Sequence, residues 1–149
     1  MKVILQRAKN CQLKIEGSVY SQIDAGLLIL LGITHEDTQE DIDWLIKKIT
    51  QLRIFGDEEG KMNLSVKDVG AALMVVSQFT LHASTKKGNR PSYIKASKPD
   101  HAIPLYEKFV SRCREEIENV ATGVFGADMK INFTNDGPVT IIIDSKQKE

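Results

Sequence analysis

The chain has 149 residues, of which 42% are hydrophobic and 27% are charged, and its formal net charge is zero. This length and balance predict a single domain, residues 1–149, with an adequate hydrophobic core. Zero net charge argues against a general affinity for nucleic acid. No apolar run is long enough to span a membrane, and a charge interrupts the apolar run at the N-terminus. Neither a membrane span nor a signal peptide is therefore expected.

The cysteines and histidines point to no redox or metal chemistry. Cys11 and Cys113 lie far apart and form no Cys-x-x-Cys motif, which is typical of reduced residues in a cytosolic protein. The three histidines show no metal-ligand spacing among themselves or with the cysteines. We therefore expect a cytoplasmic protein without a metal site.

The first part of the chain alternates short apolar stretches with turn residues. We expect four strands there, joined by tight turns at Glu16-Gly17 and 24–26, and these strands cover residues 2–8, 11–16, 18–23 and 26–33. Closely spaced strands of this kind predict an antiparallel meander.

Two helices are expected. The first begins at Thr38, because Asp41 three residues later forms a capping-box-like pair with it. Its apolar residues recur at helical spacing in one stripe, namely Ile42, Leu45, Ile46, Ile49 and Leu52. The second helix is expected from Asp100 to about Val120, with Pro104 near its first turn, where proline is tolerated.

Between the helices, Leu73 to Val76 form an uninterrupted apolar run, the pattern of a strand buried on both faces. The run ends in Ser77, Gln78, Phe79 and Thr80. Three hydrogen-bonding side chains at the end of a buried strand are costly unless they are paired or used. Nearby backbone can satisfy them, or they can form a site that the strand holds rigidly.

Residues 130–134 and 139–143 predict two further strands, separated by a turn over Asn135-Asp-Gly-Pro138. The whole pattern predicts an α+β fold with mostly antiparallel strands and two principal helices on a sheet or barrel.

The segment from Val69 to Pro99 contains no Asp or Glu, yet it carries five basic residues: Lys86, Lys87, Arg90, Lys95 and Lys98. In a neutral chain this is a local positive patch. It is either a solvated loop or a surface that contacts phosphates.

Two stretches, Ser77-Gln-Phe-Thr-Leu81 and Asn135-Asp-Gly-Pro-Val-Thr140, closely resemble the signature motifs of the D-aminoacyl-tRNA deacylase family, Ser-Gln-Phe-Thr-Leu and Asn-x-Gly-Pro-x-Thr. Five more segments resemble family blocks in family order, at residues 26–32, 52–55, 60–64, 87–91 and 122–129. The resemblance covers nearly the whole chain. It departs mainly at residues 8–12, where Ala-Lys-Asn-Cys-Gln replaces a more usual Val-x-x-Ala-Ser pattern.

The resemblance implies a compact, β-barrel-like domain with helices that works as a homodimer. It implies hydrolysis of the ester between a D-amino acid and the terminal adenosine of tRNA, and removal of glycine mischarged on tRNA for alanine. No metal or organic cofactor is implied. The Gly137-Pro138 bond is cis in the family, and each subunit's Gly-Pro reaches the partner's active site.

With this substrate, we expect Ser77, Gln78 and the backbone of Phe79 and Thr80 to form a catalytic scaffold with oxyanion donors. The neighbouring ribose hydroxyl would assist the attacking water. Thr80 as nucleophile is the alternative, and His82 would share its face if the strand continued.

Further residues are expected to bind substrate or tRNA. Phe125, Ala127 and Met129 either line an adenine pocket or are plain core. Gly137 and Pro138 would exclude L-side chains, while Asn135 and Thr140 brace their turn. Lys86, Lys87 and Arg90 would contact tRNA phosphates. The alternative function is a non-catalytic nucleic-acid-binding module on the same fold.

Overall fold

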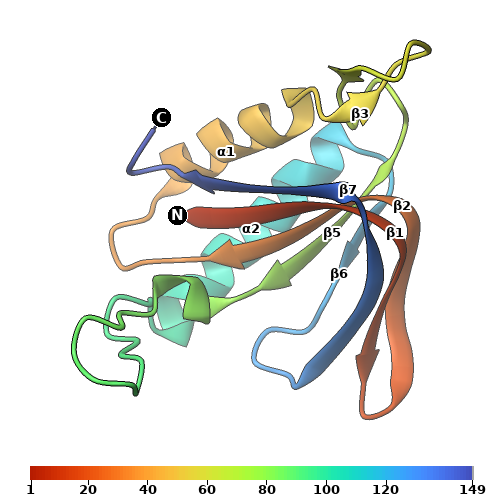
Figure 1. The fold of residues 1–149 in the computed structure, drawn as a ribbon. Coiled ribbons are helices and arrows are strands. Elements are labelled where there is room, and N and C mark those ends of the chain that lie inside the picture. Colours follow the sequence, from red (N-terminus) through yellow and green to blue (C-terminus); the bar gives the residue numbers. More distant parts are fainter. Residues whose placement is uncertain (149) are drawn as a thin grey trace.

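In the computed structural model, which describes residues 1–148, five strands form one strongly bent sheet with two helices on one face (Figure 1). The spatial order of the strands is β6 (Val120–Thr122), β5 (Ala72–Ser77), β2 (Ser18–Gly32), β1 (Lys2–Ile15) and β7 (Met129–Asp144). β1 pairs antiparallel with β2 and β7, whereas β5 pairs parallel with β2 and β6. A separate small hairpin contains β3 (Phe55–Gly56) and β4 (Met62–Leu64).

The expected α+β fold with two principal helices is confirmed, but the barrel-like closure is wrong. β6 and β7 are the two edges of the sheet and do not pair with each other. β6 offers only three residues to a strand of sixteen, too short an edge for closure. Instead, β1, β2 and β7 curl (Figure 1), and the concave side away from the helices is filled by a second apolar cluster that includes Cys11, Leu13, Ile23, Leu28 and Met74.

Two long strands replace the four short ones expected before the first helix. The turn at Glu16-Gly17 is as predicted, but residues 24–26 do not reverse the chain, because Gly26 pairs with Ala8 and Ala25 with Lys9. Asn10 has a φ of 50°, and the pairing of β1 with β7 shifts register between Lys9 and Gln12. A bulge therefore bends β1 at the level where β2 has its turn-prone residues, and the two strands bend together.

The helices α1 (Gln39–Gln51) and α2 (Pro99–Glu116) follow their predictions closely. The Thr38 N–H donates to Asp41 Oδ2 at 2.8 Å, as the capping pattern predicted. The α1 stripe packs on the sheet, fully at four positions and partly at Leu52. α2 ends four residues early, because the chain must reach β6, and Pro104 lies beyond its first turn. Within residues 1–148, no helix combines the length and apolarity needed to cross a membrane.

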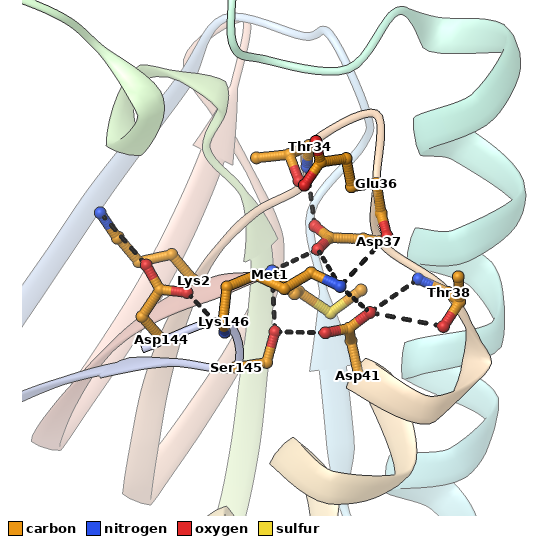
Figure 2. A network of polar contacts seen from close by, with 10 residues as sticks. All are labelled: Met1, Lys2, Thr34, Glu36, Asp37, Thr38, Asp41, Asp144, Ser145 and Lys146. Atoms are coloured by element: carbon orange, nitrogen blue, oxygen red, sulfur yellow. Dashed lines mark hydrogen bonds and ion pairs between the residues drawn. The ribbon is translucent and has the colours of Figure 1, made fainter. Parts of the chain in front are cut away.

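A buried polar network ties β1 and the segment after β7 to the start of α1 (Figure 2). The Met1 amino group donates to Asp37 Oδ1 and, at 2.9 Å, to Ser145 Oγ. The Ser145 hydroxyl donates to Asp41 Oδ1 at 2.6 Å, and Lys146 Nζ lies 2.9 Å from Asp41 Oδ2. Asp41 thus both caps α1 and holds the end of the sheet.

The Asp41 carboxyl should make the free energy of unfolding depend on pH in the acidic range. Burial by itself raises its pKa, but hydrogen bonds from Ser145, Lys146 and the Thr38 N–H outweigh this and lower the pKa from 3.8 to about 2. The ionised carboxylate therefore contributes fully to the free energy of unfolding above pH 4, and this contribution is lost as the pH falls towards 2. We expect Asp41→Asn to lower the free energy of unfolding at pH 7 by about 2 kcal/mol.

Urea denaturation at pH 7 and pH 2.5 measures this effect, with Asp43→Asn, an exposed carboxylate on the same helix, as the matched control. The Asp41→Asn variant should lose less stability between the two pH values than the wild type loses. An equal loss in both proteins would contradict the assignment.

Candidate active site

β5 ends at Ser77, and the 3-10 helix η1 (Phe79–His82) follows at once. Ser77 pairs with Leu31, and the Gln78 N–H donates to the Leu31 carbonyl at 2.8 Å, which fixes the end of the strand. Gly32 allows η1 to pack closely, because a Cβ there would lie only 3.0 Å from Leu81 Cβ and 3.1 Å from the Gln78 carbonyl oxygen. The chain therefore leaves the sheet at the Ser-Gln-Phe-Thr segment.

A cavity of about 300 Å³ opens at this end of β5. Six of the predicted site residues line it: Ser77, Gln78 and Phe79 on one segment, and Phe125, Ala127 and Met129 on the loop before β7 and the first residue of that strand. Leu31, Ile33 and Ala102 contribute apolar lining. The fold thus brings together two segments about fifty positions apart in sequence.

The aromatic and sulfur-containing residues of this cavity are also anchored in the core. Phe125 makes an edge-on contact with Tyr106, with ring centroids 6.1 Å apart. The Tyr106 hydroxyl donates to the Val75 carbonyl at 2.8 Å, and burial raises its pKa to about 12, so it remains a donor. A Cβ on Gly123 would lie 2.4 Å from Met129 Sδ, so Met129 packs directly on that glycine. Phe125 and Met129 therefore belong to the core and to the cavity wall at once.

Thr80 is not among the residues that line this cavity. Its Oγ1 accepts a hydrogen bond from Gln78 Nε2 at 2.5 Å. The strand does not continue to His82, so the shared face considered for a Thr80–His82 pair does not exist. His82 is buried and lines a different cavity, of about 540 Å³, and burial lowers the pKa of its imidazole.

The backbone at the start of η1 offers two donors. The first turn bond in this segment runs from the Leu81 N–H to the Gln78 carbonyl. The Phe79 and Thr80 N–H groups precede it, and neither donates to another group among residues 1–148. Such N–H groups are the kind that stabilise an oxyanion.

Ser97 is a cavity residue that the sequence did not indicate. Its N–H donates to the Ile33 carbonyl at 2.8 Å, which places it beside the end of β2. Its Oγ lines the cavity, is buried and has no hydrogen-bond partner within the described chain. In the run Lys95-Ala-Ser-Lys98 it reads as an ordinary loop serine. No three His, Cys, Asp or Glu residues among positions 1–148 are grouped so as to hold a metal ion.

The Asn135-Asp-Gly-Pro138 segment is a bulge inside β7 rather than a turn between two strands. Asn135 pairs with Ala8 and Thr140 with Gln6, so the residues between them on β7 oppose Arg7 alone. The Gly137-Pro138 peptide bond is cis. Asn135 accepts from the Val139 N–H at 3.1 Å and donates to Thr140 Oγ1 at 3.0 Å, so both side chains brace the bulge, as expected.

Arg7 supports this bulge from β1. Its Nε donates to the Asp136 carbonyl at 2.9 Å and its Nη1 to the Ile54 carbonyl at 2.7 Å. Gly137 has a φ of 130°, and a Cβ there would lie 3.0 Å from Arg7 Nη2. Gly137 and Pro138 are exposed, and neither lines the cavity at β5. Within one chain, therefore, the two resemblance motifs do not form a common cavity.

The basic residues lie on a loop that protrudes from the body beside η1 (Figure 1). Ser84 and Ser92 exchange two backbone hydrogen bonds, of 2.8 and 2.9 Å, and close the loop at its base. Lys86, Lys87 and Arg90 are exposed, and none of them forms an ion pair with the residues described.

Relatives of this chain carry one recurring description. The family model described as D-Tyr-tRNA(Tyr) deacylase matches residues 4–144. A D-aminoacyl-tRNA deacylase of Parabacteroides distasonis is 61% identical, over 100% of both chains. Another, of Thermus aquaticus, is 55% identical over 99% of this chain and 97% of that protein.

Solved structures share the fold. One described as c-Myc DNA Unwinding Element Binding Protein is 38% identical, with a TM-score of 0.92 over 97% of this chain and 98% of that one. A probable eukaryotic D-amino acid tRNA deacylase is 17% identical, with a TM-score of 0.82 over 95% and 97%, and this likeness shows the fold alone. With the family match extending over residues 4–144 and full-length relatives above half identity, the chain belongs to the D-Tyr-tRNA(Tyr) deacylase family.

Proposed function

We propose that this protein hydrolyses the ester bond of D-aminoacyl-tRNA, releasing free D-amino acid and tRNA, and that it also removes glycine mischarged on tRNA for alanine. The observation that carries the proposal is the cavity at the end of β5, where the Ser77–Phe79 segment faces Phe125, Ala127 and Met129. A binding module without catalysis would not need free backbone donors beside such a cavity.

In this proposal the terminal adenosine occupies the cavity. Phe125 and Met129 offer aromatic and sulfur surface to the adenine, which suits a base face. The unpaired Ser97 hydroxyl offers a hydrogen bond to the nucleoside. The ester then lies near the start of η1, beside Ser77 and Gln78.

Hydrolysis needs no protein nucleophile here. Water adds to the ester carbonyl carbon, the carbonyl oxygen becomes an oxyanion, and the bond to the ribose oxygen breaks as that oxygen takes a proton. The Phe79 and Thr80 N–H groups stabilise the oxyanion, an effect of about 3 kcal/mol per donor in comparable sites. The adjacent ribose hydroxyl assists the water. The Thr80 hydroxyl is occupied by its bond with Gln78, which holds η1 in shape.

The protruding loop supplies the electrostatic contact with tRNA. Lys86, Lys87 and Arg90 are exposed and form no ion pair with a carboxylate among residues 1–148, and their loop protrudes from the body (Figure 1), so they are available to backbone phosphates. The two cysteines are free and buried, and we place the reaction in the cytoplasm.

We further propose a homodimer in which Gly137-Pro138 of each chain reaches the cavity of the other. Two observations support it. The bulge is exposed and rigidly held, yet it lies outside its own chain's cavity. In addition, Ile142 on the same strand is 66% exposed, whereas Ile141 and Ile143 pack against the core, so the Ile142 side chain points away from the helices and is open to a partner chain.

Chirality would then be read by exclusion. Carbonyl groups of the Gly-Pro segment accept hydrogen bonds from the α-ammonium group, while η1 fixes the ester. With these two groups fixed, the D- and L-enantiomers differ only in which of the two remaining positions on the α-carbon holds the hydrogen and which holds the side chain. A D-side chain points outwards, and an L-side chain collides with the segment. Glycine, which has no side chain, is accepted.

The function is tested by deacylation of D-tyrosyl-tRNA and L-tyrosyl-tRNA without added metal. We expect the D-ester to be hydrolysed at least about 100-fold faster than the L-ester in kcat/KM. Release of radiolabelled tyrosine measures both rates against spontaneous hydrolysis. Equal rates for the two esters, or no rate above the spontaneous one, would refute the proposed activity.

Thr80→Ala separates the two mechanisms. Because the hydroxyl braces Gln78 and does not attack, we expect the variant to retain at least about a tenth of the wild-type kcat, whereas removing a nucleophile costs a factor on the order of 10⁶. Thr80→Ser keeps the brace and should stay close to wild type. A loss of the larger size, with an acyl-enzyme trapped on the wild type, would establish covalent catalysis instead.

Mixing two inactive variants tests the shared site. Gly137→Ala strains a backbone that favours glycine and crowds Arg7, so it should cut activity more than tenfold. Gln78→Ala should do the same, because Gln78 lines the cavity where we place the ester, whereas Thr80 does not. If each site takes Gly137 from one chain and Gln78 from the other, an equimolar mixture refolded together regains about a quarter of wild-type activity.

Gly17→Ala is the matched control, because Gly17 also has a positive φ but has nothing within 4 Å of its Cβ position. This variant should keep its activity. If the refolded mixture gains no activity, Gly137 and Gln78 do not serve one site from different chains.

A further inference from the structure

Two aromatic rings stand exposed at the rim of the cavity. Phe79 is 56% exposed and Tyr93 is 40% exposed, and the rings meet edge to face with centroids 5.0 Å apart and planes at 77°. Phe79 lines the cavity, whereas Tyr93 is not among the lining residues. The pair therefore extends an aromatic surface outwards from the place where we put the terminal adenosine.

The charge around this pair selects the class of ligand. Tyr93 follows the loop that Ser84 and Ser92 close, and the sequence from Val69 to Pro99 holds no carboxylate. Exposed rings at the base of a basic loop suit single-stranded nucleic acid, because bases stack on rings while cations bind phosphates. An apolar protein partner would gain nothing from the basic loop.

We propose that Tyr93, supported by Phe79, is a stacking platform for the base of the nucleotide that precedes the terminal adenosine. The inference rests on the proposed function and adds a second nucleotide subsite to it. The order of elements supports this path: the cavity, then Phe79, then Tyr93, then the loop with Lys86, Lys87 and Arg90. The unpaired 3′ end of the RNA runs along this line, and Tyr93 positions it without touching the ester.

The test compares two short substrates, the D-tyrosyl ester of adenosine and that of the dinucleotide cytidylyl-adenosine. Wild-type enzyme should show a KM about tenfold lower for the dinucleotide, because only the dinucleotide carries a base for the platform. Tyr93→Ala and Tyr93→Leu should lose this advantage with kcat little changed. Tyr93→Phe and Tyr93→Trp should keep it, because a ring is what the base needs.

Tyr20→Ala is the matched control, because Tyr20 is also exposed but lies on β2 and forms no ring contact with Phe79 in the described chain, and it should keep the dinucleotide advantage. If Tyr93→Ala still shows the lower KM for the dinucleotide ester, that advantage comes from phosphate contacts and the stacking platform is refuted. The same conclusion follows if Tyr93→Leu keeps the lower KM. A changed molecular mass of Tyr93→Ala in light scattering would show a protein contact instead, and would also overturn it. If wild-type enzyme hydrolyses neither ester, the proposed function itself fails.

Discussion

The parallel pairing of β5 with β2 is the constraint on which the rest of this structure depends. It requires Gly26, because a Cβ there would lie 1.8 Å from the Ala72 carbonyl oxygen. From that point the register runs unbroken to Leu31 and Ser77, and the Gln78 N–H to Leu31 bond ends the ladder. The position of η1, the free N–H groups at its start and the mouth of the cavity all follow from this register. A slip of one residue would turn every side chain of β5 to the other face.

The second constraint is Arg7, which converts a stretch of turn-forming residues into a fixed bulge. A free turn would move, and a moving turn cannot reject a ligand by collision. Arg7 binds the Asp136 carbonyl and, through Ile54, the segment before β3, while Asn135 closes the bulge across its neck. The wall is therefore held by groups on three segments of its own chain. Its rigidity does not depend on the molecule that it meets, as the proposed exclusion of L-side chains would require.

The sequence predicted most accurately those features that periodicity determines. The buried run at Leu73 to Val76 and the α1 stripe lie where expected, because burial on a sheet or along a helix leaves a period in the residues. The strand limits at Asp24–Gly26 and Asn135–Pro138 were wrong for one shared reason. Turn-prone residues mark a change of direction, but they do not reveal whether the chain reverses, bends or bulges, and here the partner strands decided it. The grouping of Phe125, Ala127 and Met129 with Ser77 came from resemblance. Ser97 left no signal, because its role depends on where the Ile33 carbonyl places it.

Periodicity predicts the buried elements but not the site, and this difference has a chemical basis. A hydrolase that relies on an acid, a base and a nucleophile can be identified in a sequence by the side chains that serve these roles. The ester of an aminoacyl-tRNA is already activated, so in the proposed mechanism backbone donors supply the barrier reduction that remains. Backbone N–H groups are present in every residue but proline, and only conformation leaves two neighbouring ones without a partner in the described chain. That conformation rests here on Gly32, where the missing Cβ admits Leu81 and the Gln78 carbonyl, and on the Gln78–Thr80 side-chain bond. The Ser-Gln-Phe-Thr segment is therefore informative as a geometry that these residues stabilise, and the Thr80 hydroxyl helps to hold that geometry through its bond with Gln78.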